Sequence, residues 1–164
     1  MIIGREELGP ILERERKKGR KVVFTNGCFD LVHIGHLRSL ELAKDHGDIL
    51  VVGLNSDGSV RRLKGQGRPL MEQADRASMI DGLKPVDYVV IFEEDTPIET
   101  IRALRPEVHV KGGDYSPEDL PEKEVVEAYG GKVVIVPLVE GFSTTDLIDR
   151  IGRYHAKNPK DRRL

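Results

Sequence analysis

Five short segments rich in valine and isoleucine alternate with stretches of helical periodicity, and this alternation constrains the fold more than any other feature of the chain. The segments are mostly continuous apolar runs, which are typical of strands covered on both faces. They lie at residues 21–25, 49–54, 88–92, 108–110 and 132–137. Strands separated by helices are joined by right-handed crossovers. The pattern predicts an α/β fold with a Rossmann-like, doubly wound, five-stranded parallel sheet.

Apolar residues repeat at one-turn spacing between these strands and predict the helices. The repeats lie around residues 37–43, 77–83, 98–104, 125–129 and 147–151, and a further helix is predicted at 5–18. Thr96, Pro97 and Glu99 have the pattern of a helix cap, a first-turn proline and a capping-box acid. Ser143, followed three residues later by Asp146, has the pattern of a second capping box.

Length and composition indicate one soluble cytoplasmic domain. The 164 residues are a usual domain size, and the single cysteine excludes an internal disulfide or a Cys-rich zinc site. The charged N-terminus lacks the apolar core of a signal peptide, and no later apolar run approaches membrane-spanning length. The net charge of -2 gives no general attraction to nucleic acid. We expect a helical extension at 1–20, a catalytic domain at 21–155 and a disordered basic tail at 156–164.

Polar, glycine-rich stretches follow four of the five predicted strands. In a doubly wound sheet, ligands bind beyond the carboxyl ends of the strands, where the strand order reverses. The four stretches therefore predict loops that converge on one edge and form a ligand site there. They are residues 25–28, 55–58, 111–114 and 141–145.

The densest motif is the run from Gly27 to His36, which joins the first strand to the first helix. His33 and His36 are three residues apart, so both lie on one face of the first helical turn, where free backbone amides already attract anions. Two imidazoles placed there can donate hydrogen bonds to phosphate, and Gly35 allows a ligand to approach the backbone. A capping or packing histidine is the alternative. A zinc site is disfavoured because no third and fourth ligands converge on the pair.

This run resembles the HxGH nucleotidyltransferase superfamily, which includes the cytidylyltransferases, phosphopantetheine adenylyltransferase and, more distantly, class I aminoacyl-tRNA synthetases. Ser143, Thr144 and Thr145 match a second superfamily signature at the start of the last helix. The resemblance implies the nucleotidylyl transferase fold and a contact between this signature and the triphosphate. An ordinary helix cap is compatible with that role, because Ser143 can cap while the two threonines bind ligand.

Four further runs make the stretch 25–151 similar to the family of D-glycero-β-D-manno-heptose 1-phosphate adenylyltransferases, the ADP-heptose synthases. The runs lie at residues 25–30, 55–69, 92–97 and 110–115. The resemblance implies transfer of AMP from ATP, with Mg²⁺, to a sugar 1-phosphate used for lipopolysaccharide core or surface-layer sugars. In many members this domain follows a ribokinase-type kinase domain, so the chain resembles a stand-alone version whose sugar kinase is a separate polypeptide.

The resemblance also assigns roles to residues of this chain. The two histidines are expected on the phosphates as catalytic groups, and the threonines of the second signature on the triphosphate. The expected nucleotide-binding residues are Thr25, Asn26, Gly27, Cys28, Phe29, Gly35, Ser143, Thr144 and Thr145. The substrate or phosphate candidates are Asp30, Asn55, Asp57, Lys64, Arg68, Arg76 and Asp114.

For three residues, the position in the sequence and the residue type themselves indicate a role. Lys111 directly follows the fourth strand, and the glycines after it let it approach phosphate, so it is predicted to be catalytic. Asp114 either binds a sugar hydroxyl or closes a turn. Cys28 is interpreted as a small packing residue, because no base is placed to activate it.

The sequence leaves alternative functions and partners open. CTP could replace ATP, and glycerol 3-phosphate could replace the sugar phosphate. A nucleotide-sensing module without activity is the alternative outside the enzymes. A tRNA-binding protein is disfavoured by the short chain and the lack of a basic surface. The expected partners are small molecules, with neither nucleic acid nor membrane among them, and a homo-oligomer remains open.

Overall fold

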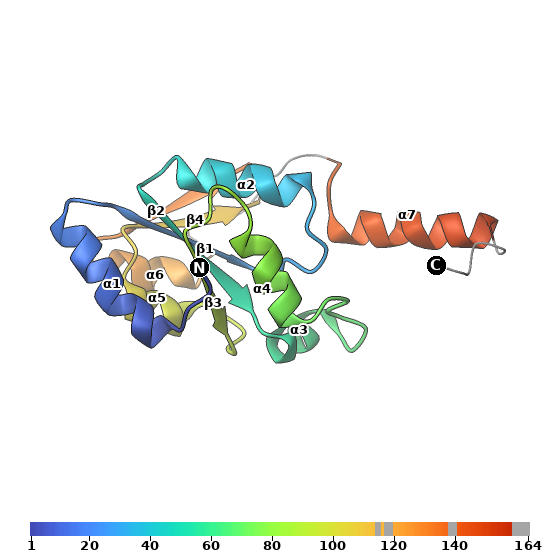
Figure 1. Cartoon of the computed structure of the whole chain (residues 1–164), viewed down its shortest axis with the longest axis horizontal. Helices are drawn as coiled ribbons and strands as arrows, with labels where there is room; N and C mark the ends of the chain where they lie inside the picture. Colours follow the sequence, from blue (N-terminus) through green and yellow to red (C-terminus); the bar gives the residue numbers. More distant parts are fainter. Residues whose placement is uncertain (114–115, 117–119, 138–140, 159–164) are drawn as a thin grey trace.

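The computed structural model describes residues 1–113, 116, 120–137 and 141–158. Its centre is a parallel five-stranded sheet with the strand order β3-β2-β1-β4-β5 (Figure 1). This arrangement confirms the predicted α/β fold, and the strand order reverses between β1 and β4. The strands are β1 (Val22–Gly27), β2 (Ile49–Asn55), β3 (Tyr88–Phe92), β4 (Val108–Gly112) and β5 (Lys132–Val136).

Helices cover both faces of the sheet, as the continuous apolar strands require. On one face, α2 (Ile34–Lys44) and α4 (Gln73–Asp81) bury Leu40 and Ile80 against the strands. On the other face lie α1 (Arg5–Lys17), α5 (Ile98–Leu104) and α6 (Glu122–Glu127). There, Leu8 and Leu12 of α1 are fully buried in the same cluster as residues of α5 and α6. The sheet is therefore covered by an apolar helical layer on each face.

One helix, α3 (Asp57–Lys64), was not predicted. The sequence predicted a polar loop at residues 55–58, because most residues of this stretch are polar. In the structure, α3 buries only Ser59 and Val60. The local signal is a cap, since the Ser56 hydroxyl accepts a hydrogen bond from the backbone N–H of Ser59 at 3.2 Å. Val60 and Leu63 are its two large apolar residues, and a single pair one turn apart is too short a pattern to predict a helix.

Several strand ends lie further along the chain than predicted. β1 ends at Gly27 and β4 at Gly112, two residues beyond the predicted ends. These polar and glycine residues remain in the sheet because their backbones pair with neighbouring strands, Asn26 with Gly53 and Gly112 with Val136. Functional side chains that were expected on loops are therefore held by strands. Pro97, rather than the predicted Thr96, is the N-cap of α5.

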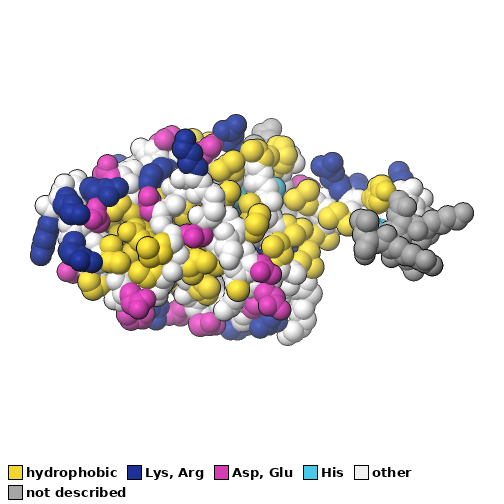
Figure 2. All heavy atoms as spheres, viewed as in Figure 1, with side chains coloured by type: hydrophobic (Ala, Val, Ile, Leu, Met, Phe, Trp, Pro, Cys, Tyr) yellow, Lys and Arg dark blue, Asp and Glu magenta, His cyan; other side chains and the backbone are white. Residues whose placement is uncertain are grey.

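The last helix, α7 (Thr144–Lys157), buries no residue and extends away from the rest of the molecule (Figure 1). On the face shown in Figure 2, basic and acidic side chains are interspersed with apolar ones. Within the described ranges, no helix is both long and apolar enough to cross a membrane. The division of the chain into an extension, a domain and a tail stays a prediction, and residues 159–164 of the expected tail lie outside the described residues.

Candidate active site

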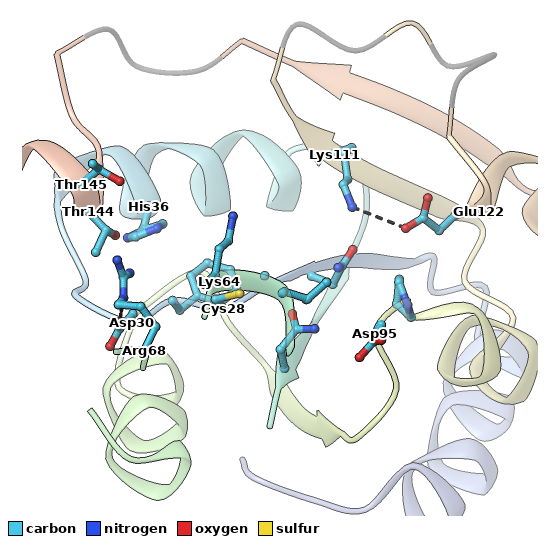
Figure 3. Close-up of a pocket in the computed structure, with 16 residues that line it drawn as sticks. Cys28, Asp30, His36, Lys64, Arg68, Asp95, Lys111, Glu122, Thr144 and Thr145 are labelled. Carbon is cyan, nitrogen blue, oxygen red and sulfur yellow. Dashed lines mark hydrogen bonds and ion pairs between the residues drawn. The ribbon is translucent and has the colours of Figure 1, made fainter. Parts of the chain in front are cut away.

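A pocket with a volume of about 520 Å³ lies at the carboxyl ends of β1, β2 and β4 (Figure 3). This is the point where the strand order reverses, so the position agrees with the general rule for open α/β sheets. The residues that line it come from seven helices or strands and their connections. They are Asn26, Gly27, Cys28, Phe29, Asp30, His36, Asn55, Leu63, Lys64, Arg68, Asp95, Pro97, Lys111, Glu122, Thr144 and Thr145.

The two histidines form a stacked pair at the start of α2. His33 is the N-cap with an extended backbone, and His36 lies in the first turn. Their ring centroids are 3.8 Å apart with an interplanar angle of 21°. The backbone N–H of His33 donates to Nδ1 of His36 at 3.3 Å. Because Nδ1 accepts, the proton of the neutral ring is on Nε2, which is then free to donate to a ligand.

Burial favours the neutral form of both imidazoles. It lowers the pKa of His36 to about 4, and the neighbouring His33 lowers that pKa further. Burial also lowers the pKa of His33. A bound polyanion would oppose these effects, because a nearby negative charge favours the imidazolium. The site can therefore offer a neutral donor when empty and gain positive charge when phosphate binds.

His33 and Gly35 support His36 rather than line the pocket. The His33 Nδ1 atom is buried and has no hydrogen-bond partner among the described residues. A Cβ on Gly35 would lie 3.0 Å from the His33 ring and 3.1 Å from Cβ of Phe142. Gly35 was predicted to admit a ligand, but in the structure the space above it is filled by these side chains. The glycine is needed for the packing of His33.

The start of α7 lies beside the histidines, on the same side of the pocket (Figure 3). The Ser143 hydroxyl accepts from the backbone N–H of Asp146 at 3.0 Å, which confirms the predicted cap. Thr144 and Thr145 line the pocket near His36 (Figure 3), whereas Ser143 does not line it. The structure thus brings together the two motifs that the sequence places more than a hundred residues apart. We refer to His36, Thr144 and Thr145 as the imidazole end of the pocket.

Asp30 is a buried anchor for the segment that contains Arg68. Its carboxylate accepts from the backbone N–H groups of Leu70 at 2.8 Å and Met71 at 3.0 Å, and it pairs with the Arg68 guanidinium. Arg68 and Lys64 both line the pocket. Asp30 is nearly inaccessible, so its oxygens are committed to the protein and it holds Arg68 in place.

Arg76 was predicted as a candidate phosphate ligand, and the structure gives it another role. Its side chain is fully buried and does not line the pocket. The guanidinium donates to the backbone oxygen of Asn55 at 2.9 Å, to the Asp57 carboxylate at 2.8 Å and to the backbone oxygen of Cys28. Arg76 therefore joins the ends of β1 and β2. Asp57 serves the same junction and also lies outside the pocket, while Asn55 lines it.

Lys111 and a residue that the sequence analysis missed, Glu122, form an ion pair at the other side of the pocket. Lys111 Nζ lies 3.4 Å from Glu122 Oε1. Glu122 is the first residue of α6, and no motif spacing distinguishes it from the neighbouring acids. Asp95 lies near the same side (Figure 3). We refer to Lys111, Glu122 and Asp95 as the lysine end of the pocket. Asp95, Leu63 and Pro97 were also missed.

The remaining predicted residues are distributed as follows. Cys28 lines the pocket and burial raises the pKa of its thiol, so the reactive thiolate is disfavoured. Gly27 and Phe29 line the pocket together, and a Cβ on Gly27 would lie 3.0 Å from the Phe29 ring. Thr25 is buried in β1 and does not line the pocket. Asp114 lies outside the described residues.

Comparison with known proteins gives matches over most of the chain. The cytidylyltransferase-like family model matches residues 24–151. The bifunctional protein HldE of Geobacter metallireducens is 56% identical over 150 residues, which are 92% of this chain and 31% of that protein. HldE of Syntrophotalea carbinolica is 56% identical over 147 residues, covering 90% of this chain and 30% of the relative. The chain thus spans about a third of the length of these relatives.

A solved structure is similar as well. The lipopolysaccharide core biosynthesis protein of Thermoplasma volcanium GSS1 superposes with a TM-score of 0.62 at 28% sequence identity. The match covers 74% of this chain and 98% of that protein. The sheet and the pocket at its carboxyl edge are therefore set in a fold that solved relatives share.

Proposed function

Because this chain is a nucleotidyltransferase of the cytidylyltransferase-like family, we propose that it transfers AMP from ATP to D-glycero-β-D-manno-heptose 1-phosphate, forming ADP-heptose and pyrophosphate. The observation that supports transfer most is the imidazole end, where His36 faces Thr144 and Thr145 at the carboxyl edge of the sheet. The choice of sugar is supported by the resemblance to heptose 1-phosphate adenylyltransferases and by a structural neighbour that acts in lipopolysaccharide core biosynthesis.

The proposed reaction is a direct in-line displacement. An oxygen of the sugar phosphate attacks the α-phosphorus of ATP, a new P–O bond forms, and the bond to the β-phosphate oxygen breaks with its electron pair leaving on pyrophosphate. A phosphate monoester is already anionic near neutral pH, so the step needs no general base. Positioning and charge stabilisation supply most of the rate in such reactions.

The residues of the pocket have distinct tasks in this scheme. His36 donates from Nε2 to an α-phosphate oxygen, where negative charge builds up in the transition state. Thr144 and Thr145 hold the β- and γ-phosphates with hydroxyls and free amides at the start of α7. In Figure 3, Lys64 lies between the two ends and Arg68 lies beside the imidazole end, so both cations are suited to binding phosphates of the nucleotide.

Magnesium belongs to this proposal as part of the ATP co-substrate. Among the described residues, no group of three or more His, Cys, Asp or Glu side chains is arranged to hold a metal ion. Asp30, the most buried carboxylate near the phosphates, is already used by Arg68 and two backbone amides. This fits an ion held mainly by substrate phosphates and water, which is common for Mg²⁺. A bound ion would neutralise phosphate charge.

The proposal also implies a reaction partner and a location. A sugar kinase must supply the sugar 1-phosphate, and the nucleotidyltransferase domain described above is not proposed to catalyse that step. ATP and sugar phosphates are cytoplasmic metabolites, which supports a cytoplasmic enzyme.

A crossed pyrophosphate-release assay tests the proposal. ATP, CTP, GTP and UTP are each combined with D-glycero-β-D-manno-heptose 1-phosphate, D-mannose 1-phosphate and glycerol 3-phosphate. We expect the highest kcat/KM for ATP with the heptose phosphate, by about tenfold or more, since each well-placed polar contact is worth about that factor. A preference for CTP or for glycerol 3-phosphate would overturn the assignment. Nucleotide binding without any pyrophosphate release would indicate a sensing module.

A further inference from the structure

Glu122 is a buried acid in the pocket that the proposed mechanism does not use. Its side chain is 3% exposed, and it lines the pocket next to Lys111. One oxygen, Oε1, pairs with Lys111 Nζ at 3.4 Å. The other oxygen, Oε2, is buried and has no hydrogen-bond partner among the described residues. The carboxylate is therefore only half satisfied by the protein.

A half-satisfied buried carboxylate is unfavourable. Charged hydrogen bonds usually have lengths of about 2.7–2.9 Å, so a separation of 3.4 Å is a loose pairing. A buried acceptor without a donor has lost its hydrogen bonds to water and gained none from the protein. Such an arrangement is expected where a ligand supplies the missing donor, as binding and catalytic sites often leave polar groups unpaired in the absence of substrate.

A second unpartnered acceptor belongs to a residue that lines the same pocket. The Oδ1 atom of Asn26 is buried without a hydrogen-bond partner among the described residues, and Asn26 lines the same pocket. β1 and β4 are neighbours with Thr25 opposite Val110, so Asn26 and Lys111 are the next residues on adjacent strands. Phe24 and His109 are also opposite each other, and alternate side chains share a face, so Asn26 and Lys111 point to the same side.

The lysine end therefore combines one cation with acceptors that need donors. His109, which lies below Lys111 on β4, adds no positive charge, because burial and the Lys111 charge lower its pKa to about 4. Asp95 is paired with Arg62 at 2.7 Å. A triphosphate at this end would meet the Glu122 carboxylate and be repelled. A polyol phosphate matches it, since the phosphate pairs with the ammonium and the hydroxyls donate to the acceptors.

We propose that the lysine end, together with Asn26, is the binding site for the acceptor substrate: Lys111 binds the phosphate of a sugar 1-phosphate, and Glu122 accepts a hydrogen bond from the hydroxyl on the neighbouring carbon. Figure 3 shows this end separated from the imidazole end by Lys64 and Cys28. The two substrates then enter from opposite ends and their phosphates meet in the middle. This assignment rests on the proposed function and gives it an orientation.

The test compares Glu122→Gln with Glu124→Gln, a matched change at an exposed position of the same helix. Glutamine keeps the size of the side chain but removes the charge that strengthens the hydroxyl contact. We expect Glu122→Gln to raise the KM for heptose 1-phosphate about tenfold, with the KM for ATP changed less than about twofold. Glu124→Gln should behave as the wild type. Equal KM values for the sugar phosphate in all three proteins would overturn the assignment.

A ligand change separates recognition from a structural effect. The 2-deoxy analogue of the sugar 1-phosphate lacks the hydroxyl assigned to Glu122, so the wild type should bind it about tenfold more weakly. The affinities of Glu122→Gln for the two ligands should differ by less than about threefold, because the substitution has already weakened the contact with the hydroxyl. If Glu122→Gln does not fold, Glu122→Asp is measured with the same two ligands. The proposal would be overturned if the variant and the wild type showed the same ratio of affinities for the sugar 1-phosphate and its 2-deoxy analogue.

Calorimetric titration of the sugar phosphate, without ATP, separates this inference from the proposed function. If no nucleotide gives turnover with the wild type, the proposed function fails. Weaker binding of sugar 1-phosphate to Glu122→Gln than to the wild type would then still support the site. No binding to the wild type, or equal binding to both proteins, would reject it.

Discussion

The two ends of the pocket differ in how they present charge to a phosphate. At the imidazole end, burial lowers the pKa of His36 to about 4, so this ring is neutral, and it stacks on the supporting His33 ring with the centroids 3.8 Å apart. At the lysine end, a full positive charge on Lys111 is set against the buried carboxylate of Glu122. The first end has donors without charge, and the second has a charge that is already balanced.

Because of this difference, the two ends are suited to different functions in catalysis. A neutral donor can strengthen its interaction as charge builds up on the α-phosphate, because the rising negative charge favours protonation of the ring. An ion pair binds an anion only by exchanging partners, so it selects ligands that also satisfy the carboxylate. The imidazole end is thus suited to the reacting phosphate, and the lysine end to choosing the acceptor.

The largest effect is expected at the imidazole end. His36→Ala should lower kcat about 10²- to 10³-fold, the usual loss when one donor to a charged transition state is removed. Thermal unfolding of the variant should remain within a few degrees of the wild type, since one partly buried ring is lost. A pyrophosphate-release assay measures kcat, and a thermal melting curve measures the unfolding temperature. A nearly normal rate would remove the histidines from the mechanism.

At the lysine end, a stability effect is expected. Lys111→Met removes the counter-ion of a buried carboxylate and should lower the free energy of unfolding by about 1–3 kcal/mol. The double variant Lys111→Met with Glu122→Gln should recover most of this loss, because the carboxylate charge is then absent. Denaturant titrations of the four proteins complete the cycle. Additive losses would show that the two groups do not interact.

Acid sensitivity should come from a third, fully buried histidine. The pKa of His109 is lowered to about 4 by burial, whereas an unfolded chain has a histidine pKa near 6.5. The unfolded state therefore binds more protons between these values, and stability falls as the pH drops from about 6.5 to 4. His109→Met should lessen this loss by about 1–2 kcal/mol at pH 5. His155→Gln, on the exposed end of α7, is the control, and an unchanged acid profile in His109→Met would contradict the expectation.

The smallest effect is expected between the two ends, at Cys28. Cys28→Ser should keep kcat within about threefold of the wild type, because burial favours the protonated thiol and the displacement needs no covalent intermediate. Steady-state rates at saturating substrates measure this. Complete loss of activity in a folded variant would require a covalent scheme.

The fold and the imidazole end could be predicted because their signals are local. Continuous apolar runs predicted all five strands, and Ser143 with Asp146 predicted the start of α7. His33 and His36 share one helical turn, so their proximity follows from spacing alone. The rule that ligands bind beyond the carboxyl ends of parallel strands then placed the two motifs together.

Lys111 was predicted at the site from its place after the fourth strand, but its partner Glu122 and the role of Arg76 could not be predicted in the same way. Glu122 meets Lys111 only after α6 packs against β4, and its sequence context is one acid among several. Arg76 resembles any basic residue on a helix until the ends of β1 and β2 close around it. Burial decides these roles, and burial depends on the complete fold. α3 was missed because an eight-residue helix with only two large apolar residues, Val60 and Leu63, is too short to show a helical periodicity.

A crystal structure with the non-hydrolysable analogue α,β-methylene ATP tests the central claim most directly. Our account predicts that the α-phosphate lies within hydrogen-bond distance of His36 Nε2 and that the β- and γ-phosphates contact Thr144 and Thr145, with no phosphate beside Glu122. A triphosphate bound at Lys111 and Glu122, with His36 free of any phosphate contact, would contradict it.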